Sequence, residues 1–116
     1  MPDTLPFPSR DTVDLPAPDL SALQRALGPR VMSDRFSRGR YSTDASIYQM
    51  LPHGVVVPET MDDVRVALDF AREKGLSVLP RGGGTSQCGQ TVNHALVIDN
   101  TKHLNRLLSV DVENRR

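Results

Sequence analysis

The most restrictive feature of this sequence is a strand–helix–strand pattern between residues 54 and 79. Residues 54–58 read Gly-Val-Val-Val-Pro, and such a short β-branched run bounded by Gly and Pro is typical of a strand buried on both faces. An amphipathic helix is predicted over residues 60–75 and a second strand over residues 76–79. Because a helix crossover joins parallel strands, the pattern predicts a small parallel sheet in a right-handed βαβ unit.

The predicted helix carries its own start and stop signals. Thr60 is a good N-cap with Asp63 three residues later, and Lys74-Gly75 is typical of a helix C-terminus. The apolar residues between these signals fall on one core-facing stripe: Val64, Ala67, Leu68 and Ala71. Further strands are predicted over residues 95–99 and 107–113, so the fold class is α+β.

The beginning of the chain has a different composition. Six of the nine prolines lie between Pro2 and Pro29, which predicts an extended arm over residues 1–40. One short helix interrupts the arm: Asp19 caps it, Gly28-Pro29 ends it, and its apolar face consists of Leu20, Leu23 and Leu27. Residues 33–52 are polar and Arg-rich, and they predict a loop with one helical turn. We assign residues 41–116 to the folded domain.

Charge and composition exclude several classes of function. The 14 basic and 14 acidic residues balance, which argues against a nucleic acid partner and against a polybasic membrane surface. No apolar run approaches the roughly 20 residues of a membrane-spanning helix, and no export signal is visible, so we expect a cytoplasmic location. The lone thiol, Cys88, is expected to pack as a small loop side chain and cannot build an iron–sulfur cluster. The histidines (His53, His94 and His103) lack the spacing of metal ligands.

Residues 80–90, Pro-Arg-Gly-Gly-Gly-Thr-Ser-Gln-Cys-Gly-Gln, carry the strongest functional signal. This segment leaves the carboxyl end of a predicted parallel strand, where open α/β sheets place their ligands. Three consecutive glycines allow positive φ, so successive N–H groups can gather around an anion such as a phosphate. Thr85 and Ser86 add hydroxyl donors, and Arg81 offers a guanidinium to the anion or braces the loop. The alternative is a plain flexible turn.

Two common phosphate-binding motifs do not fit this loop. The dinucleotide fingerprint is matched at Gly82 and Gly84 but fails at Gln87, and a strand follows where a helix is required. The P-loop pattern has Gly84 and Gly89 at the right separation, but Gln90 occupies the position of the phosphate-binding lysine.

The order of several segments resembles the start of the FAD-binding domain of the vanillyl-alcohol oxidase and p-cresol methylhydroxylase (PCMH-type) flavoproteins. The resemblance spans residues 41–116 and rests on residues 44–48, 55–60, 80–86, 97–99 and 105–106. Within that family the chain looks most like bacterial FAD-linked 2-hydroxy acid dehydrogenases, which include glycolate oxidase subunits, D-lactate dehydrogenases and D-2-hydroxyglutarate dehydrogenase-like proteins with a fused iron–sulfur part. Residues 46–52 point to the last of these.

The resemblance implies an FAD site at this loop. It implies that the residues around the FAD pyrophosphate are Arg81, Gly82, Gly83, Gly84, Thr85 and Ser86, with Gly89 and Gln90 continuing the wall and Pro58 beside the cofactor. Some members attach the flavin covalently through a histidine at the position that Thr85 occupies here, so dissociable, non-covalent FAD is expected.

The resemblance also implies what this chain does not carry. In the family, the rest of the FAD domain and a substrate domain with the catalytic groups follow, and we assign no catalytic residue between Met1 and Arg116. We therefore expect an incomplete, FAD-binding N-terminal portion of an oxidoreductase. Its 2-hydroxy acid substrate would meet a downstream domain, and any iron–sulfur part would lie outside this chain. The alternatives are a non-catalytic phosphate- or nucleotide-binding module and a degenerate remnant.

Overall fold

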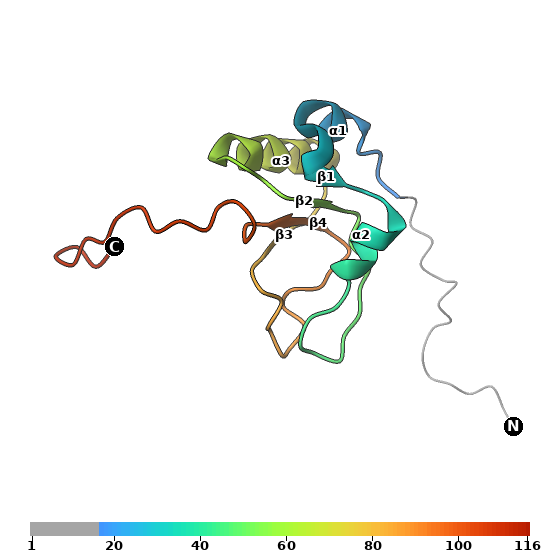
Figure 1. Ribbon diagram of the computed structural model, residues 1–116. Helices are drawn as coiled ribbons and strands as arrows, with labels where there is room; N and C mark the ends of the chain where they lie inside the picture. The colour runs from blue at the N-terminus through green and yellow to red at the C-terminus, as the bar shows by residue number, and fades with distance from the viewer. Residues whose placement is uncertain (1–16) are drawn as a thin grey trace, which may run out of the picture.

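The computed structural model describes residues 17–116, in which a small sheet is covered on one face by two helices (Figure 1). Its elements run in the order α1 (Ser21–Leu27), the 3-10 turn η2 (Gly28–Arg30), β1 (Val31–Met32), α2 (Arg35–Arg40), β2 (Gly54–Val56), α3 (Met61–Lys74), β3 (Val78–Arg81) and β4 (Leu96–Asp99). The first part of the predicted arm, residues 1–16, lies outside the described residues.

The sheet has the order β1-β2-β4-β3, so β4 lies between the two strands of the predicted βαβ unit. Val97 of β4 lies opposite Val55 of β2 and opposite Leu79 of β3, and both pairings are parallel. The predicted small parallel sheet and the α+β class are therefore confirmed. The two-residue strand β1 pairs antiparallel with β2 and was not predicted.

The two faces of the sheet bury different sets of side chains, as the alternation along a strand requires. Val56, Leu96 and Ile98 pack beneath the helices in one core cluster, which also contains Leu20, Leu23, Leu27, Val31, Ala67, Phe70 and Ala71. Val55, Val57 and Val97 pack on the opposite face around the Tyr41 ring. Strands β2 and β4 are thus buried on both sides, in agreement with their largely apolar sequences.

Helix α3 begins and ends at the predicted signals. The Thr60 hydroxyl accepts a hydrogen bond from the Asp63 amide, and the Asp63 carboxylate accepts one from the Thr60 amide in return. At the other end Gly75 adopts a left-handed conformation with φ 66°. The same helix end explains why β3 starts at Val78, two residues after the predicted start: the Leu76 amide bonds to the Ala71 carbonyl and so still belongs to the helix cap.

Residues 17–40 contribute directly to the core. The N-cap of α1 is Leu20 and not the predicted Asp19, although the Asp19 carboxylate accepts the Ser21 amide at 2.9 Å just before the helix. The apolar face of α1 is buried against the sheet and α3, and β1 adds an edge strand. The single helical turn predicted within residues 33–52 is α2, which Asp34 caps through the Ser37 amide.

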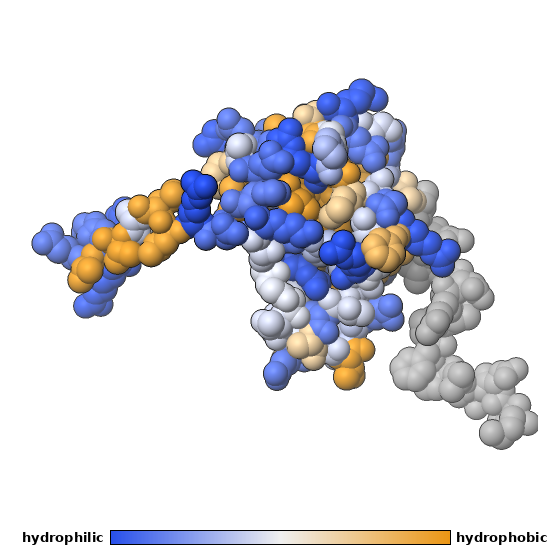
Figure 2. All heavy atoms as spheres, in the orientation of Figure 1, coloured by the Kyte–Doolittle hydropathy of each residue, from blue (hydrophilic) through white to orange (hydrophobic). Residues whose placement is uncertain are grey.

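The predicted strand over residues 107–113 is wrong. This segment runs away from the sheet (Figure 1), and Figure 2 shows its apolar side chains as a line outside the body of the molecule. Leu107 and Leu108 are 82% and 88% exposed, and Val110 and Val112 are similarly open. An alternating pattern forms a strand only when it pairs with a neighbouring strand, and this segment pairs with none of the strands of the sheet β1-β2-β4-β3.

Candidate functional site

The glycine loop, residues 82–90, follows β3 and lies against a second loop formed by residues 41–53, here called the bracing loop. The Ala45 amide donates to the Gly84 carbonyl at 3.1 Å, and the Thr91 hydroxyl donates to the Asp44 carboxylate at 2.9 Å. Figure 1 shows the two loops descending together from the sheet. A strand, β4, follows the glycine loop. The sequence predicted this strand, and the dinucleotide and P-loop motifs both require a helix there instead.

Two glycines of the loop have a backbone conformation that favours glycine. Gly84 has φ 70° and Gly89 has φ 79°, whereas Gly82 and Gly83 have no positive φ. A Cβ atom on Gly84 would lie 2.5 Å from a guanidinium nitrogen of Arg81, and one on Gly89 would lie 2.7 Å from the Tyr48 ring. Of the three consecutive glycines, only Gly84 therefore needs its special conformation for the turn itself.

The main-chain N–H groups of residues 83–86 are the donors that the loop offers to a ligand. They donate no hydrogen bond to any acceptor within residues 17–116. Gly83 and Thr85 are exposed, and Gly84 and Ser86 are half-buried. Because unpaired donors are stable only where water or a ligand reaches them, this stretch is open to an anion.

Arg81 stands at the base of the loop and faces main-chain oxygens. Its guanidinium donates to the carbonyls of Tyr41 at 3.3 Å, Thr91 at 2.9 Å and Thr43 at 2.7 Å. It also lies over the Tyr41 ring, 5.4 Å from the ring centre. Arg81 therefore braces the loop, and its partners are main-chain carbonyls of the bracing loop and of Thr91, the residue that follows the glycine loop.

The remaining predicted site residues lie further from these amides along the chain. Gln90 closes the loop tip, where its side-chain oxygen accepts the Cys88 amide at 3.2 Å. Pro58 follows the end of β2 and is fully buried, so its side chain offers no surface to a ligand. The structure thus gathers residues 81–86 in one place, with Gly89 and Gln90 at the other end of the same loop.

The expectation that Cys88 packs as a small side chain of the loop is wrong. Its side chain is exposed and does not pack against the sheet. It lines an open pocket of about 420 Å³ between the tips of the two loops, together with Gln87 and Tyr48. The loop tip projects away from the sheet, so a small side chain there has no core to enter.

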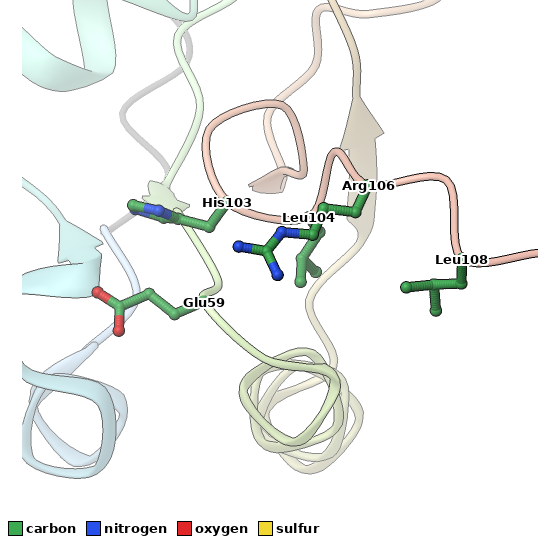
Figure 3. Close-up of a pocket in the computed structure, with 5 residues that line it drawn as sticks. All are labelled: Glu59, His103, Leu104, Arg106 and Leu108. Carbon is green, nitrogen blue, oxygen red and sulfur yellow. The ribbon is translucent and has the colours of Figure 1, made fainter.

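A second hollow lies at the carboxyl ends of β2 and β4. Figure 3 shows the residues that line it: Glu59 from the β2–α3 connection, and His103, Leu104, Arg106 and Leu108 from the segment after β4. The space between them is about 610 Å³. None of its lining residues belongs to the glycine loop, so this hollow and the exposed amides are separate features.

Sequence reasoning missed a buried polar cluster at the carboxyl end of β4. The Tyr41 hydroxyl donates to the Asp99 carboxylate, which also accepts the Thr101 amide at 2.9 Å and its hydroxyl at 2.6 Å. Burial and the bond to Asp99 raise the pKa of Tyr41 to about 12. Burial works against the charge on Asp99, but the bonds from Thr101 and Tyr41 outweigh it and lower the pKa of that carboxyl. An acidic residue at the end of a buried apolar strand is the signal that marks this cluster.

Residues 17–116 contain no group of three potential metal ligands of the His, Cys, Asp or Glu type. None of the helices in that range has the length and apolar character that crossing a bilayer requires.

The fold and the glycine loop define a flavin-binding class of protein, and the chain belongs to the family described as FAD binding domain, which matches residues 52–116. The sequence is 42% identical to the D-2-hydroxyglutarate dehydrogenase of Pantoea ananatis over 86 residues, which cover 72% of this chain and 8% of that protein. It is 37% identical to the glycolate oxidase subunit GlcD of Bacillus subtilis over 92 residues, which cover 75% of this chain and 19% of the relative. The chain therefore spans less than a tenth of the first relative's length.

Solved structures share the fold. An alkyldihydroxyacetonephosphate synthase aligns with a TM-score of 0.66 at 19% identity, covering 84% of this chain and 22% of that chain. A p-cresol methylhydroxylase aligns with a TM-score of 0.57 at 14% identity, covering 79% and 19%. The resemblance to PCMH-type flavoproteins and to 2-hydroxy acid dehydrogenases, first inferred from the sequence, is confirmed.

Proposed function

We propose that this chain supplies the pyrophosphate-binding part of the FAD site in a flavin-dependent dehydrogenase that oxidises a 2-hydroxy acid. Membership of the FAD binding domain family supports FAD as the ligand, and the similarity to D-2-hydroxyglutarate dehydrogenases and to GlcD supports the substrate class. The observation that carries the proposal is the row of accessible N–H groups over residues 83–86, since a diphosphate takes such donors.

The roles of individual residues follow from this geometry. Amides of Gly83, Gly84, Thr85 and Ser86, with the Ser86 hydroxyl, would surround the diphosphate. Gly82 would precede this stretch, and Gly89 and Gln90 would shape the far end of the loop. Pro58 would border the cofactor through its backbone, because its side chain is buried. The groups that carry out the oxidation, the substrate site and any iron–sulfur part would lie outside residues 1–116.

Two finer properties belong to the proposal. FAD would be bound without a covalent link, because Thr85 has no nucleophilic ring nitrogen to offer to the flavin. Acid denaturation of FAD-loaded protein is then expected to release all flavin into the supernatant, and flavin remaining with the precipitate would refute the proposal of dissociable FAD. The cytoplasm is the proposed location, because a single exposed thiol suits a reducing compartment.

The amide assignment can be tested by NMR on the isotopically labelled 116-residue chain. Titration with FAD and with ADP, which share the diphosphate, is expected to shift the amide signals of residues 82–86. FMN, which lacks the diphosphate, is expected to shift them less. Absence of any shift with millimolar FAD would contradict the proposed site. Equal responses to FAD, ADP and inorganic pyrophosphate would favour a general phosphate-binding module.

Gly83→Val offers a matched variant for the same titration. A Cβ on Gly83 has only the Thr85 methyl group within 4 Å, at 3.7 Å, so the fold has space for the side chain. The branched side chain would crowd the amides, and we expect it to abolish the FAD-induced shifts while the helix signals stay unchanged. Gly39→Val places the same side chain at an open position outside the loop and should leave the shifts as in the wild type.

A further inference from the structure

We propose that Arg81 acts as a positioning residue, which holds the glycine loop in its binding conformation through main-chain carbonyls and does not itself bind the diphosphate. This inference rests on the proposed function, because it assigns a role within the same site. It differs from the expectation that the Arg81 guanidinium contacts the pyrophosphate.

The first observation concerns the partners of the guanidinium. Two of its nitrogens donate to three carbonyls from two separate stretches of chain, those of Tyr41 and Thr43 in the bracing loop and that of Thr91. The planar fork of arginine suits such divided contacts, whereas a lysine ammonium has a single nitrogen. The ion pairs within residues 17–116 do not include Arg81, so its polar contacts are with the two loops.

The second observation comes from Gly84. This residue has φ 70°, and a Cβ atom there would lie 2.5 Å from one guanidinium nitrogen and 3.1 Å from the guanidinium carbon. The guanidinium therefore lies directly against the backbone of the glycine loop. The Gly84 carbonyl accepts the Ala45 amide at 3.1 Å, so this carbonyl is turned toward the bracing loop.

A second tie between the loops supports the same role. The Asp44 carboxylate accepts both the hydroxyl and the amide of Thr91, at 2.9 and 3.4 Å. Hydrogen bonds from Ser46 and from Thr91 lower the pKa of Asp44 to about 2, so this carboxylate stays charged at neutral pH. Arg81 and Asp44 thus both fix Thr91, where the chain leaves the glycine loop.

These contacts assign loop positioning and anion binding to different groups of the site. The side chains of Arg81 and Asp44 hold the loop through its flanks, while the amides of residues 83–86 stay without partners within residues 17–116. A loop ordered before binding loses less conformational freedom when the anion arrives, which raises affinity without any direct contact. The geometry of Arg81, more than its charge, should then determine the affinity.

The test compares Arg81→Lys with Arg81→Gln in the full 116-residue chain, using ADP as the probe. Both variants are expected to bind ADP about tenfold more weakly than the wild type, because each breaks the multiple carbonyl contacts. A direct ion-pair role predicts a different result, in which Arg81→Lys keeps near wild-type affinity and only Arg81→Gln loses it. That result would overturn the proposal.

A readout in the ligand-free protein distinguishes positioning from a general loss of stability. Amide signals of Thr43, Ala45 and Thr91 are expected to move in Arg81→Lys before any ADP is added, at a temperature where circular dichroism shows the fold intact. If those signals stay in place while ADP affinity falls, Arg81 is a direct ligand. A residue with a role in stability alone would lower the melting temperature and leave the ADP affinity of the folded protein unchanged, which would also overturn the proposal.

Two further variants keep the proposal testable if the Arg81 substitutions unfold the chain. Thr91→Val removes the hydroxyl bond to Asp44 and leaves every charge in place, and it is expected to weaken ADP binding several-fold; unchanged affinity would refute the positioning role. Gly84→Ala displaces the guanidinium from the other side, so its cost in affinity should be smaller in an Arg81→Lys background than in the wild type. Equal costs in both backgrounds would also count against the proposal.

Arg40→Gln serves as the control for charge. Arg40 is exposed beside Tyr41, so this variant removes the same charge nearby without touching the carbonyl contacts, and ADP affinity should stay at the wild-type value. A loss as large as that of Arg81→Gln would show that local charge governs binding. Absence of ADP-induced shifts in the wild type itself would refute the proposed function, not the role of Arg81 within it.

Discussion

At the level of single residues, the pair of Tyr41 and Asp99 joins the end of β4 to the start of the bracing loop. The carboxylate lies in the core with 4% of its surface exposed, and its hydrogen bonds come from Tyr41 and Thr101. A buried charge is stable only when its hydrogen-bonding capacity is used. The Tyr41 hydroxyl is therefore a structural group, and its ring also supports the Arg81 guanidinium.

Tyr41→Phe is expected to lower the free energy of unfolding at pH 7 by about 2 kcal/mol, because the Asp99 carboxylate loses one hydrogen bond in a buried position. The pKa of about 12 for Tyr41 in the folded chain exceeds the ordinary tyrosine value of 10.0. The wild type should thus lose stability as pH rises from about 10 to 12, and Tyr41→Phe should lose less. Urea unfolding at pH 7 and pH 11 measures both effects.

The control for this variant is Tyr48→Phe. The Tyr48 ring is 55% exposed, and loss of its hydroxyl should leave the urea midpoint at pH 7 unchanged. Equal stability of Tyr41→Phe and the wild type at pH 7 would show that the bond between Tyr41 and Asp99 contributes nothing to the fold.

At the level of elements, Asp63 ties the start of α3 to the η2 turn. Its carboxylate accepts the amides of Glu59 and Thr60 and the Arg30 guanidinium, the last at 2.7 Å. Burial opposes its charge, but these hydrogen bonds prevail and lower the pKa of Asp63. One side chain thus closes the capping box and also anchors the turn that leads into β1.

Asp63→Asn is expected to cost about 2 kcal/mol at pH 7, because hydrogen bonds to a carboxylate exceed those to an amide in strength. Since the folded-state pKa of Asp63 lies below its unfolded value, the difference between variant and wild type should shrink as pH falls below about 4. Asp62→Asn, in the same helical turn, breaks only an exposed pair with Arg65 and should cost a few tenths of a kcal/mol at most. Denaturant titrations of both variants measure the contrast, and equal costs would contradict the anchoring role.

The elements also show what the sequence could and could not predict. Helix α3 was predicted to within a residue because its capping box and C-terminal glycine are local signals. Its predicted apolar stripe is only partly right, because Ala67 and Ala71 are buried whereas Leu68 is 44% exposed. The position of β4 between β2 and β3 was not predicted, because strand order depends on contacts between distant segments. The two residues of β1 are too few to show any periodicity. At the site, the run of glycines predicted where the loop lies. The partners of Arg81 could not be predicted, because they lie up to 40 residues away along the chain and the motif around Arg81 does not indicate them.

At the level of the whole molecule, residues 17–106 form the packed body and residues 107–116 extend from it (Figure 2). The side chains that stabilise the body lie in two clusters on the two faces of the sheet. Leu107 and Leu108 belong to neither cluster and remain more than four-fifths exposed. Hydrophobic stabilisation follows the apolar area removed from water, so this segment contributes little to folding.

Deletion of residues 107–116 is therefore expected to leave the melting temperature of the chain unchanged within about 2 °C, because no buried contact is lost. Leu96→Ala, which empties a fully buried position in β4, should cost about 2–5 kcal/mol in the same calorimetric experiment and shows that the measurement detects core contacts. A fall of many degrees in the deletion variant would mean that the alternating residues of this segment pack on the sheet in solution, as their pattern first predicted.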